Sequence, residues 1–225
     1  MKKFLIPILT VIILLAGCNH PKTESVIDSN KTHSLMSGMI ILRNGDALEK
    51  LREFVNLDET ELLENALAEY PDISIGGTGV TKQNIIDLLE MIDTRTVPVS
   101  PDLKLSGITY YPDYPQLYIS FKNGSGEIYG FNFLLKYKNV EEVLQKEMGK
   151  KPTSIYQKEN DRLKVYNTTG ENDSDTNHIV FLMDIDGYFV RAGYRNNEKD
   201  VSKMKPDELF KDFSLTYLKD IPWAD

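Results

Sequence analysis

The chain has 225 residues, 26 basic and 34 acidic, which gives a formal net charge of −8 at neutral pH. This acidity argues against nucleic acid as a partner and against broad contact with anionic lipids or polymers, because like charges repel. The chain has a single cysteine, which excludes an internal disulfide, so stability must come from an ordinary hydrophobic core.

Residues 1–17 have the composition of an export signal. Lys2 and Lys3 provide a positive start, an apolar run follows, and small residues precede Cys18. The apolar run is shorter than the roughly 20 residues that a membrane-spanning helix needs. We therefore expect this segment to be a signal peptide that is removed.

Leu15, Ala16, Gly17 and Cys18 resemble the lipobox of bacterial lipoproteins. The resemblance implies cleavage before Cys18 and a diacylglyceryl thioether on its sulfur. It also implies a protein held in the cell membrane by acyl chains such as palmitate and facing outside the cytoplasm. The resemblance covers residues 1–18 and indicates nothing about the family of the folded part.

Residues 18–38 are polar, contain proline and show no apolar period. Such a composition predicts a flexible tether that follows the lipid. Fully extended, it would span about 70 Å at about 3.5 Å per residue. His20 and His33 lie in this tether, so they are poor candidates for a preorganised site.

Residues 39–97 are expected to form a helical subdomain with three helices. The first follows Gly45, the second begins at Asp58 with Glu61 in a capping-box position, and the third follows Thr81. Apolar residues recur at helical spacing in each: Leu48, Leu51 and Val55; Leu62, Leu63, Ala66 and Leu67; Ile85, Leu88, Leu89 and Ile92.

GGTGVTK, residues 76–82, is glycine-rich and stands before the third helix, as a phosphate-binding loop does. It lacks the spacing of such a loop, so we interpret it as a turn with Thr81 as the helix cap. The following stretch VPVSPDLK, residues 97–104, contains two prolines and no period and is expected to mark a domain boundary.

Beyond this boundary a period of two predicts an antiparallel domain over residues 103–225, while a single domain over 39–225 stays open. The expected strands are 105–111, 116–122, 127–135, 153–158, 162–168, 178–184 and 188–195. NGSG at 123–126 and the dipeptide Asp186–Gly187 predict tight hairpin turns.

Two helices are expected among these strands. Asn139 is placed to cap a helix that ends at Gly149, and a second helix begins at Pro206 with Leu209, Phe210 and Phe213 facing inward. The fold class is therefore α+β, with an N-terminal helical segment followed by an antiparallel sheet with covering helices. Three strands and a helix occur twice, so the interpretations are a weak β-β-β-α repeat or chance similarity.

Side chains suited to catalysis are few. Outside the tether the only histidine is His178, which excludes zinc and iron sites built on several histidines. Lipid attachment would remove Cys18 as a nucleophile, and no GxSxG motif is present. Because His178 opens an apolar strand, we interpret it as a half-buried structural residue. No catalytic residue and no cofactor are predicted.

The segment DSDTNHIVFLMD, residues 173–184, carries oxygen ligands at EF-hand-like spacing. Asp173, Asp175, Asn177 and Asp184 fall at positions 1, 3, 5 and 12. The glycine required at position 6 is replaced by histidine, and residues 179–184 have the pattern of a strand. A solvated acidic loop is therefore favoured over a calcium site.

TYYPDYPQLY, residues 109–118, is the richest aromatic stretch. Its two prolines stiffen a loop that is expected to present Tyr110 and Tyr114 to a partner, since tyrosine is enriched at binding surfaces. The favoured function is a non-catalytic binding module in the cell envelope, with an unidentified envelope protein or wall component as partner. The alternative is a carboxylate-based hydrolase of envelope glycans, which would leave no linear motif.

Overall fold

The computed structural model describes residues 38–77, 79–137, 140–148, 154–168 and 177–224. The expected signal peptide, Cys18, the two tether histidines, Asp173 and Asp175 lie outside the described residues. The predictions for these residues therefore stay predictions.

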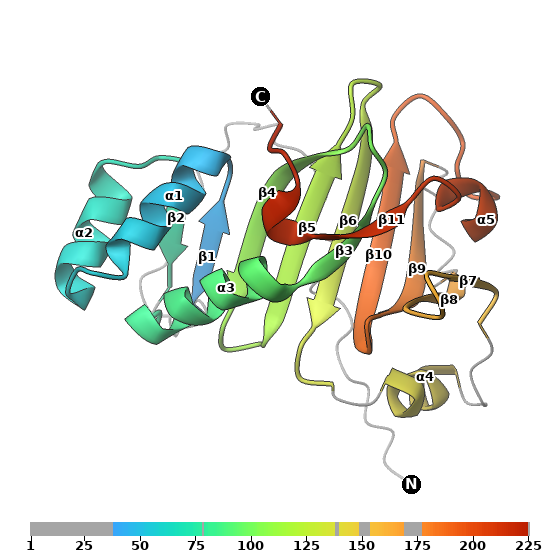
Figure 1. Cartoon of the computed structure of the whole chain (residues 1–225), viewed down its shortest axis with the longest axis horizontal. Coiled ribbons are helices and arrows are strands. Elements are labelled where there is room, and N and C mark those ends of the chain that lie inside the picture. Colours follow the sequence, from blue (N-terminus) through green and yellow to red (C-terminus); the bar gives the residue numbers. More distant parts are fainter. Residues whose placement is uncertain (1–37, 78, 138–139, 149–153, 169–176, 225) are drawn as a thin grey trace, which may run out of the picture. The chain divides into compact units, whose positions relative to one another are not determined.

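The largest element is a nine-stranded antiparallel sheet with the order β2-β1-β4-β5-β6-β10-β9-β8-β7 (Figure 1). Its strands are β1 Met39–Leu42, β2 Ile73–Gly76, β4 Lys104–Tyr111, β5 Gln116–Lys122, β6 Glu127–Leu134, β7 Tyr156–Lys158, β8 Leu163–Thr168, β9 His178–Ile185 and β10 Tyr188–Asn196. Together with the helices it makes a mixed α+β fold that is mostly β, which confirms the α+β class. The segment expected to be helical also supplies β1 and β2 to this sheet.

The helices are α1 Gly45–Phe54, α2 Glu59–Ala68, α3 Lys82–Thr94, α4 Val140–Met148, α5 Pro206–Leu209 and the 3₁₀ turn η2 Leu218–Asp220. Two further strands, β3 Thr96–Val99 and β11 Ser214–Tyr217, pair antiparallel with each other. We call this pair the strap. In Figure 1 the strap and α3 cross in front of the large sheet.

The predicted caps and turns that fall on described residues are confirmed, whereas the expected cap Asn139 and helix end Gly149 lie outside the described residues. Asp58 accepts a hydrogen bond from the Glu61 amide at 2.9 Å, and Thr81 forms a capping box with Asn84. Asp186 and Gly187 have φ angles of 51° and 80°, the left-handed pair that a two-residue hairpin turn requires.

One face of the sheet forms the core. The alternate residues that point to this face are almost fully buried beneath the helices and the strap, among them Ile40, Ile108, Ile119, Phe131, Phe181 and Val190. On the opposite face α4 covers a smaller apolar cluster that includes Leu134, Leu144 and Phe189. Burial on one side and polar residues on the other explain the period of two in these strands.

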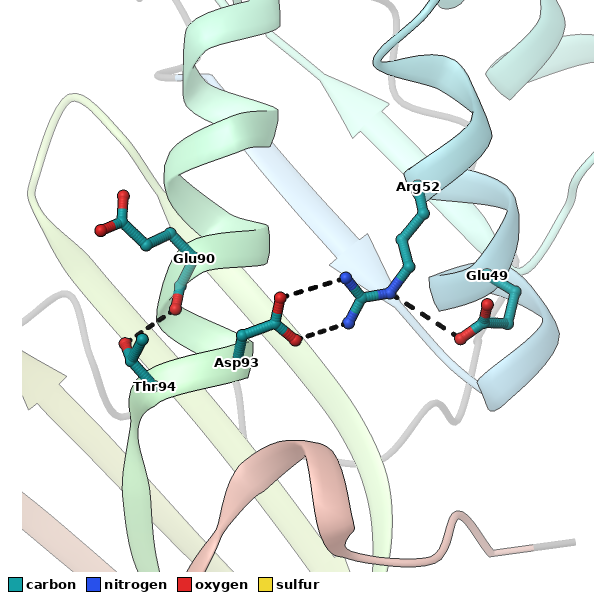
Figure 2. Close-up of polar contacts among 5 residues, drawn as sticks. All are labelled: Glu49, Arg52, Glu90, Asp93 and Thr94. Carbon is teal, nitrogen blue, oxygen red and sulfur yellow. Dashed lines mark hydrogen bonds and ion pairs between the residues drawn. The ribbon is translucent and has the colours of Figure 1, made fainter.

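Helices α1 and α3 are joined by an ion pair on the covered side of the sheet. Arg52 donates to both carboxylate oxygens of Asp93, at 2.7 and 3.2 Å, and its Nε lies 3.8 Å from Glu49 (Figure 2). The hydrogen bond from Arg52 holds the pKa of Asp93 below its usual range. This bidentate contact links the two helices.

The segment expected to be a boundary is part of the fold. Residues 96–99 form β3, all four of them buried, and the strand pairs with β11. Pro98 does not prevent this strand, because a proline is tolerated where its missing amide hydrogen is not needed for pairing. Strand β1 likewise lies inside the large sheet, between β2 and β4.

Candidate functional site

An open pocket of about 620 Å³ lies where the strap, α5, the start of β6 and the end of β10 meet. This volume is in the range of small-molecule sites in proteins. Residues after β3, at the start of β6, near the end of β10 and around α5 supply the lining: Ser100, Pro101, Asp102, Glu127, Tyr129, Tyr194, Met204, Glu208, Leu209, Asp212 and Phe213.

The pocket has an aromatic floor. Tyr129 and Tyr194 are directly paired neighbours on β6 and β10, and their ring centroids are 4.7 Å apart. The ring of Phe213, just before β11, lies 5.2 Å from that of Tyr129. All three side chains are buried, and residues from the sheet and the strap hold them in place. The floor is therefore rigid before any ligand binds.

Glu127 stands beside this floor, held by neutral donors. Its Oε1 accepts hydrogen bonds from the Tyr194 hydroxyl at 2.8 Å and from Asn196 at 3.3 Å. Its Oε2 accepts one from Asn123 Nδ2 at 2.6 Å. These donors orient the carboxylate without cancelling its charge, because none of them is a cation.

Asp102 is tied to Glu127 through Asn123, which also donates to the Asp102 Oδ2 at 3.1 Å. The Ser100 hydroxyl donates to the other carboxylate oxygen. The hydrogen bond from Ser100, supported by Asn123, holds the pKa of Asp102 below its usual range. The Asp102 carboxylate is thus an anion at neutral pH.

Two further carboxylates, Glu208 and Asp212, are exposed at the rim of the pocket. Lysine, arginine and histidine are absent from the residues that line it. Lys211 approaches Asp212 at 3.9 Å, but both side chains are about 70% exposed, where such a pair contributes little. The charged residues of the lining are consequently all acidic.

The tyrosine loop lies at the other end of the sheet. Tyr114 is 62% exposed, as expected, between β4 and β5. Tyr110 is only 6% exposed and packs in the core, because its position on β4 points toward the helices. The expectation that Tyr110 is presented to a partner is wrong. The pocket lies beyond the opposite end of β5, so the structure does not bring it together with the loop.

His178 begins β9 and is half-buried. Its Nε2 occupies the space over Gly193 of β10, only 3.1 Å from where a Cβ would stand. The imidazole thus fills a gap left by glycine on the sheet. It does not line the pocket.

Of the four EF-hand-like positions the structure describes Asn177 and Asp184, and it holds these two far apart. Asn177 immediately precedes β9 and Asp184 lies near its end, so the extended chain separates them by about 23 Å. Asp184 instead accepts a hydrogen bond from the Gly187 amide at 2.7 Å in the hairpin turn. Across the described residues no group of three or more histidines, cysteines, aspartates and glutamates is arranged to bind a metal.

Comparison with protein-family models, with curated proteins and with solved structures finds no match to this chain. The described helices are all too short or too polar to cross a membrane. The inference about function therefore depends on the geometry above.

The residues of the pocket were not identified from the sequence. Glu127 and Asp102 flank turns, where acidic residues are common, and they are 25 positions apart. One signal was present in the sequence. Tyr129 lies two residues after Glu127, which begins β6, and Tyr194 lies two residues before Asn196, which ends β10. Only the pairing of β6 with β10 brings them together.

Proposed function

We propose that this protein is a lipid-anchored, non-catalytic binding module of the cell envelope, and that the pocket beside Glu127 is its ligand site. The observation that supports this is the preformed network of Asp102, Asn123, Glu127 and Tyr194 around an aromatic floor. Side chains that are already fixed favour binding, because little conformational entropy is lost when the ligand binds.

The pocket gives less support to the hydrolysis of glycans. Such a reaction needs one carboxyl group that stays protonated near neutral pH to act as the acid. The pKa of Asp102 is shifted in the opposite direction by Ser100 and Asn123. The Ser100 hydroxyl donates to Asp102, and no histidine lines the pocket to act as its base.

Binding is tested by cross-linking in intact cells. The variant Asp102→Asn with Glu127→Gln is compared with wild type and with Glu64→Gln/Glu90→Gln, which removes two charges from exposed positions on α2 and α3. We expect the pocket variant alone to lose its cross-linked partner. Equal cross-linking of all three proteins would contradict the assignment, and release of reducing sugar ends that depends on Glu127 would favour the hydrolase.

The lipid anchor is a separate part of the proposal and rests on residues 15–18. Cells grown with a labelled fatty acid should incorporate label into the wild-type chain and not into Cys18→Ala. The variant should also leave the membrane fraction. A wild-type chain without label would contradict the membrane localisation and leave the pocket unaffected.

We also propose that the part of the sheet that follows residues 39–97 in the sequence consists of two related halves. The meander β4-β5-β6 is followed by α4, and the meander β8-β9-β10 is followed by α5. Their last strands, β6 and β10, lie side by side and antiparallel at the centre of the sheet. This arrangement supports a duplicated β-β-β-α unit related by an approximate two-fold axis.

A further inference from the structure

We infer that the pocket selects a ligand that carries a primary ammonium group on an aliphatic chain, such as a lysine side chain or a free diamine. This inference rests on the proposed binding function and specifies its ligand. It follows from three features of the same cavity, namely its aromatic floor, the way its inner carboxylate is held, and the sign of its charge.

The floor matches the apolar part and the charge of such a ligand. The faces of aromatic rings attract cations and also pack against methylene groups. Tyr129, Tyr194 and Phe213 pack against one another, with ring centroids 4.7 and 5.2 Å apart, and the small exposed part of their side chains forms the floor. Met204 and Leu209 add apolar wall beside it. An alkyl chain would thus lie against this surface with its ammonium group near the carboxylates.

Glu127 provides an acceptor at the inner end. Three neutral donors fix its carboxylate, and a carboxylate has about four lone-pair sites, so acceptor capacity remains. An ammonium group has three N–H donors and no acceptor, which suits oxygens that belong to several carboxylates. Asp102 supplies the second carboxylate. Asn123 donates to both acids and so holds them at the same edge of the pocket.

The sign of the charge favours a cation over other ligand classes. A carboxylate or phosphate would meet Asp102, Glu127, Glu208 and Asp212 with no basic residue of the lining to offset them. A neutral polyol would gain hydrogen bonds but no charge attraction. The described carboxylates also do not converge as a metal site. A primary ammonium group satisfies the floor and the charge together.

The test is a titration of the folded chain, followed by NMR, with three ligands of matched length. Cadaverine carries two ammonium groups, 1,5-pentanediol is its neutral counterpart, and glutarate is the anionic one. We expect cadaverine to bind and to shift the ring signals of Tyr129 and Tyr194, with at least about tenfold weaker binding of the other two ligands. Added salt should weaken cadaverine binding.

Variants locate the effect. Glu127→Gln should weaken cadaverine binding about tenfold, the scale of one hydrogen bond to a charged group. The exposed Glu64→Gln removes the same charge far from the pocket and should leave binding nearly unchanged. If both variants lose affinity equally, cadaverine binds through net charge alone and the inference is wrong.

The remaining outcomes separate this inference from the proposed function. Equal binding of pentanediol in the pocket would overturn the selection for ammonium and keep the binding module. Absence of shifts at Tyr129 and Tyr194 with all three ligands would also overturn it. The cross-linking comparison in cells then decides the binding function independently.

Discussion

Acidic side chains are held differently at the two ends of the strap. Near Thr96, where the strap ends at one side, Asp186 accepts hydrogen bonds from Arg162 at 2.6 and 2.8 Å and from the Thr96 hydroxyl. At the other end Glu127 is held by tyrosine and asparagine side chains. A cation neutralises the first carboxylate, whereas neutral donors orient the second and leave its charge available.

The difference separates structural carboxylates from candidate functional ones in an acidic protein. Asp186 lies in the β9–β10 turn and links Arg162, which directly precedes β8, to Thr96 of the strap. Its charge therefore stabilises contacts within the fold. Burial alone would raise its pKa, but the hydrogen bonds from Arg162 and Thr96 outweigh burial and lower it. The carboxylates of the pocket have no such partner in their lining.

Removal of the Asp186 charge tests this contrast with the largest expected effect. Asp186→Asn should lower the free energy of unfolding by about 2 kcal/mol, because charged hydrogen bonds to Arg162 are lost. Urea unfolding followed by circular dichroism would measure the change. Glu127→Gln keeps a hydrogen-bonding amide in the same place, so it should lower the free energy of unfolding by less than Asp186→Asn does. The reverse order would mean that the roles of the two carboxylates are exchanged.

Acid should affect the cation-held carboxylates as a group. The pKa values of Asp93 and Asp186 are lowered in the folded state, so the unfolded chain binds protons first as the pH falls. Their stabilising contribution is complete well above the unfolded value of about 3.9 and is lost as pH drops below about 4. Unfolding measured from pH 7 to pH 3 should show this loss. Asp93→Asn should make the pH dependence shallower, and an unchanged slope would contradict it.

Loss of a single neutral donor should have a smaller effect. Tyr194→Phe removes the hydroxyl that donates to Glu127 and keeps the ring of the floor. We expect a loss of about 1 kcal/mol in stability together with weaker cadaverine binding. Calorimetric titration of both proteins would measure the binding. If affinity is unchanged, the orientation of Glu127 does not depend on this hydroxyl.

His178, at the start of β9, lies at neither end of the strap and provides a further comparison. His178→Ala should lower stability by about 1 kcal/mol, because the imidazole no longer covers Gly193. Cadaverine binding should stay unchanged, since His178 does not line the pocket. A loss of binding at unchanged stability would show that the histidine belongs to the functional site.

The smallest effect is expected at the tyrosine loop. Tyr114→Ala should change stability by less than about 0.5 kcal/mol, as is usual for exposed positions. Tyr110→Ala should be far more destabilising because its ring is in the core. Cross-linking with Tyr114→Ala therefore tests the loop as a partner surface without disturbing the fold. Full partner recovery would show that Tyr114 is dispensable.

The sequence predicted the long strands well because local patterns determine them. Residues 116–122 alternate apolar and polar side chains, and NGSG and Asp186–Gly187 define the turns beside their strands. Strands β1, β2, β3 and β11 were missed. Each has four residues, too few for a period, and each gains its stability from pairing with a distant segment.

The pocket was out of reach for the same reason. Asp102 and Glu127 are joined through Asn123 of the hairpin turn, and Tyr194 arrives from 67 positions beyond Glu127. No local spacing encodes such a meeting. The prediction for Tyr110 failed because neighbouring residues of a strand point to opposite faces, and Tyr110 points to the face that forms the core.

The position of β1 has a mechanical consequence. The preceding chain enters the described fold at Gly38, whose amide donates to Asp113 at 3.0 Å, and continues directly into β1. Because β1 is paired on both sides, with β2 and with β4, a pull on the N-terminal side along the strand would load two ladders of hydrogen bonds in shear. Force would be shared by several bonds at once instead of opening them one after another. Tension on the proposed tether would thus act on a strand that is paired along both of its sides.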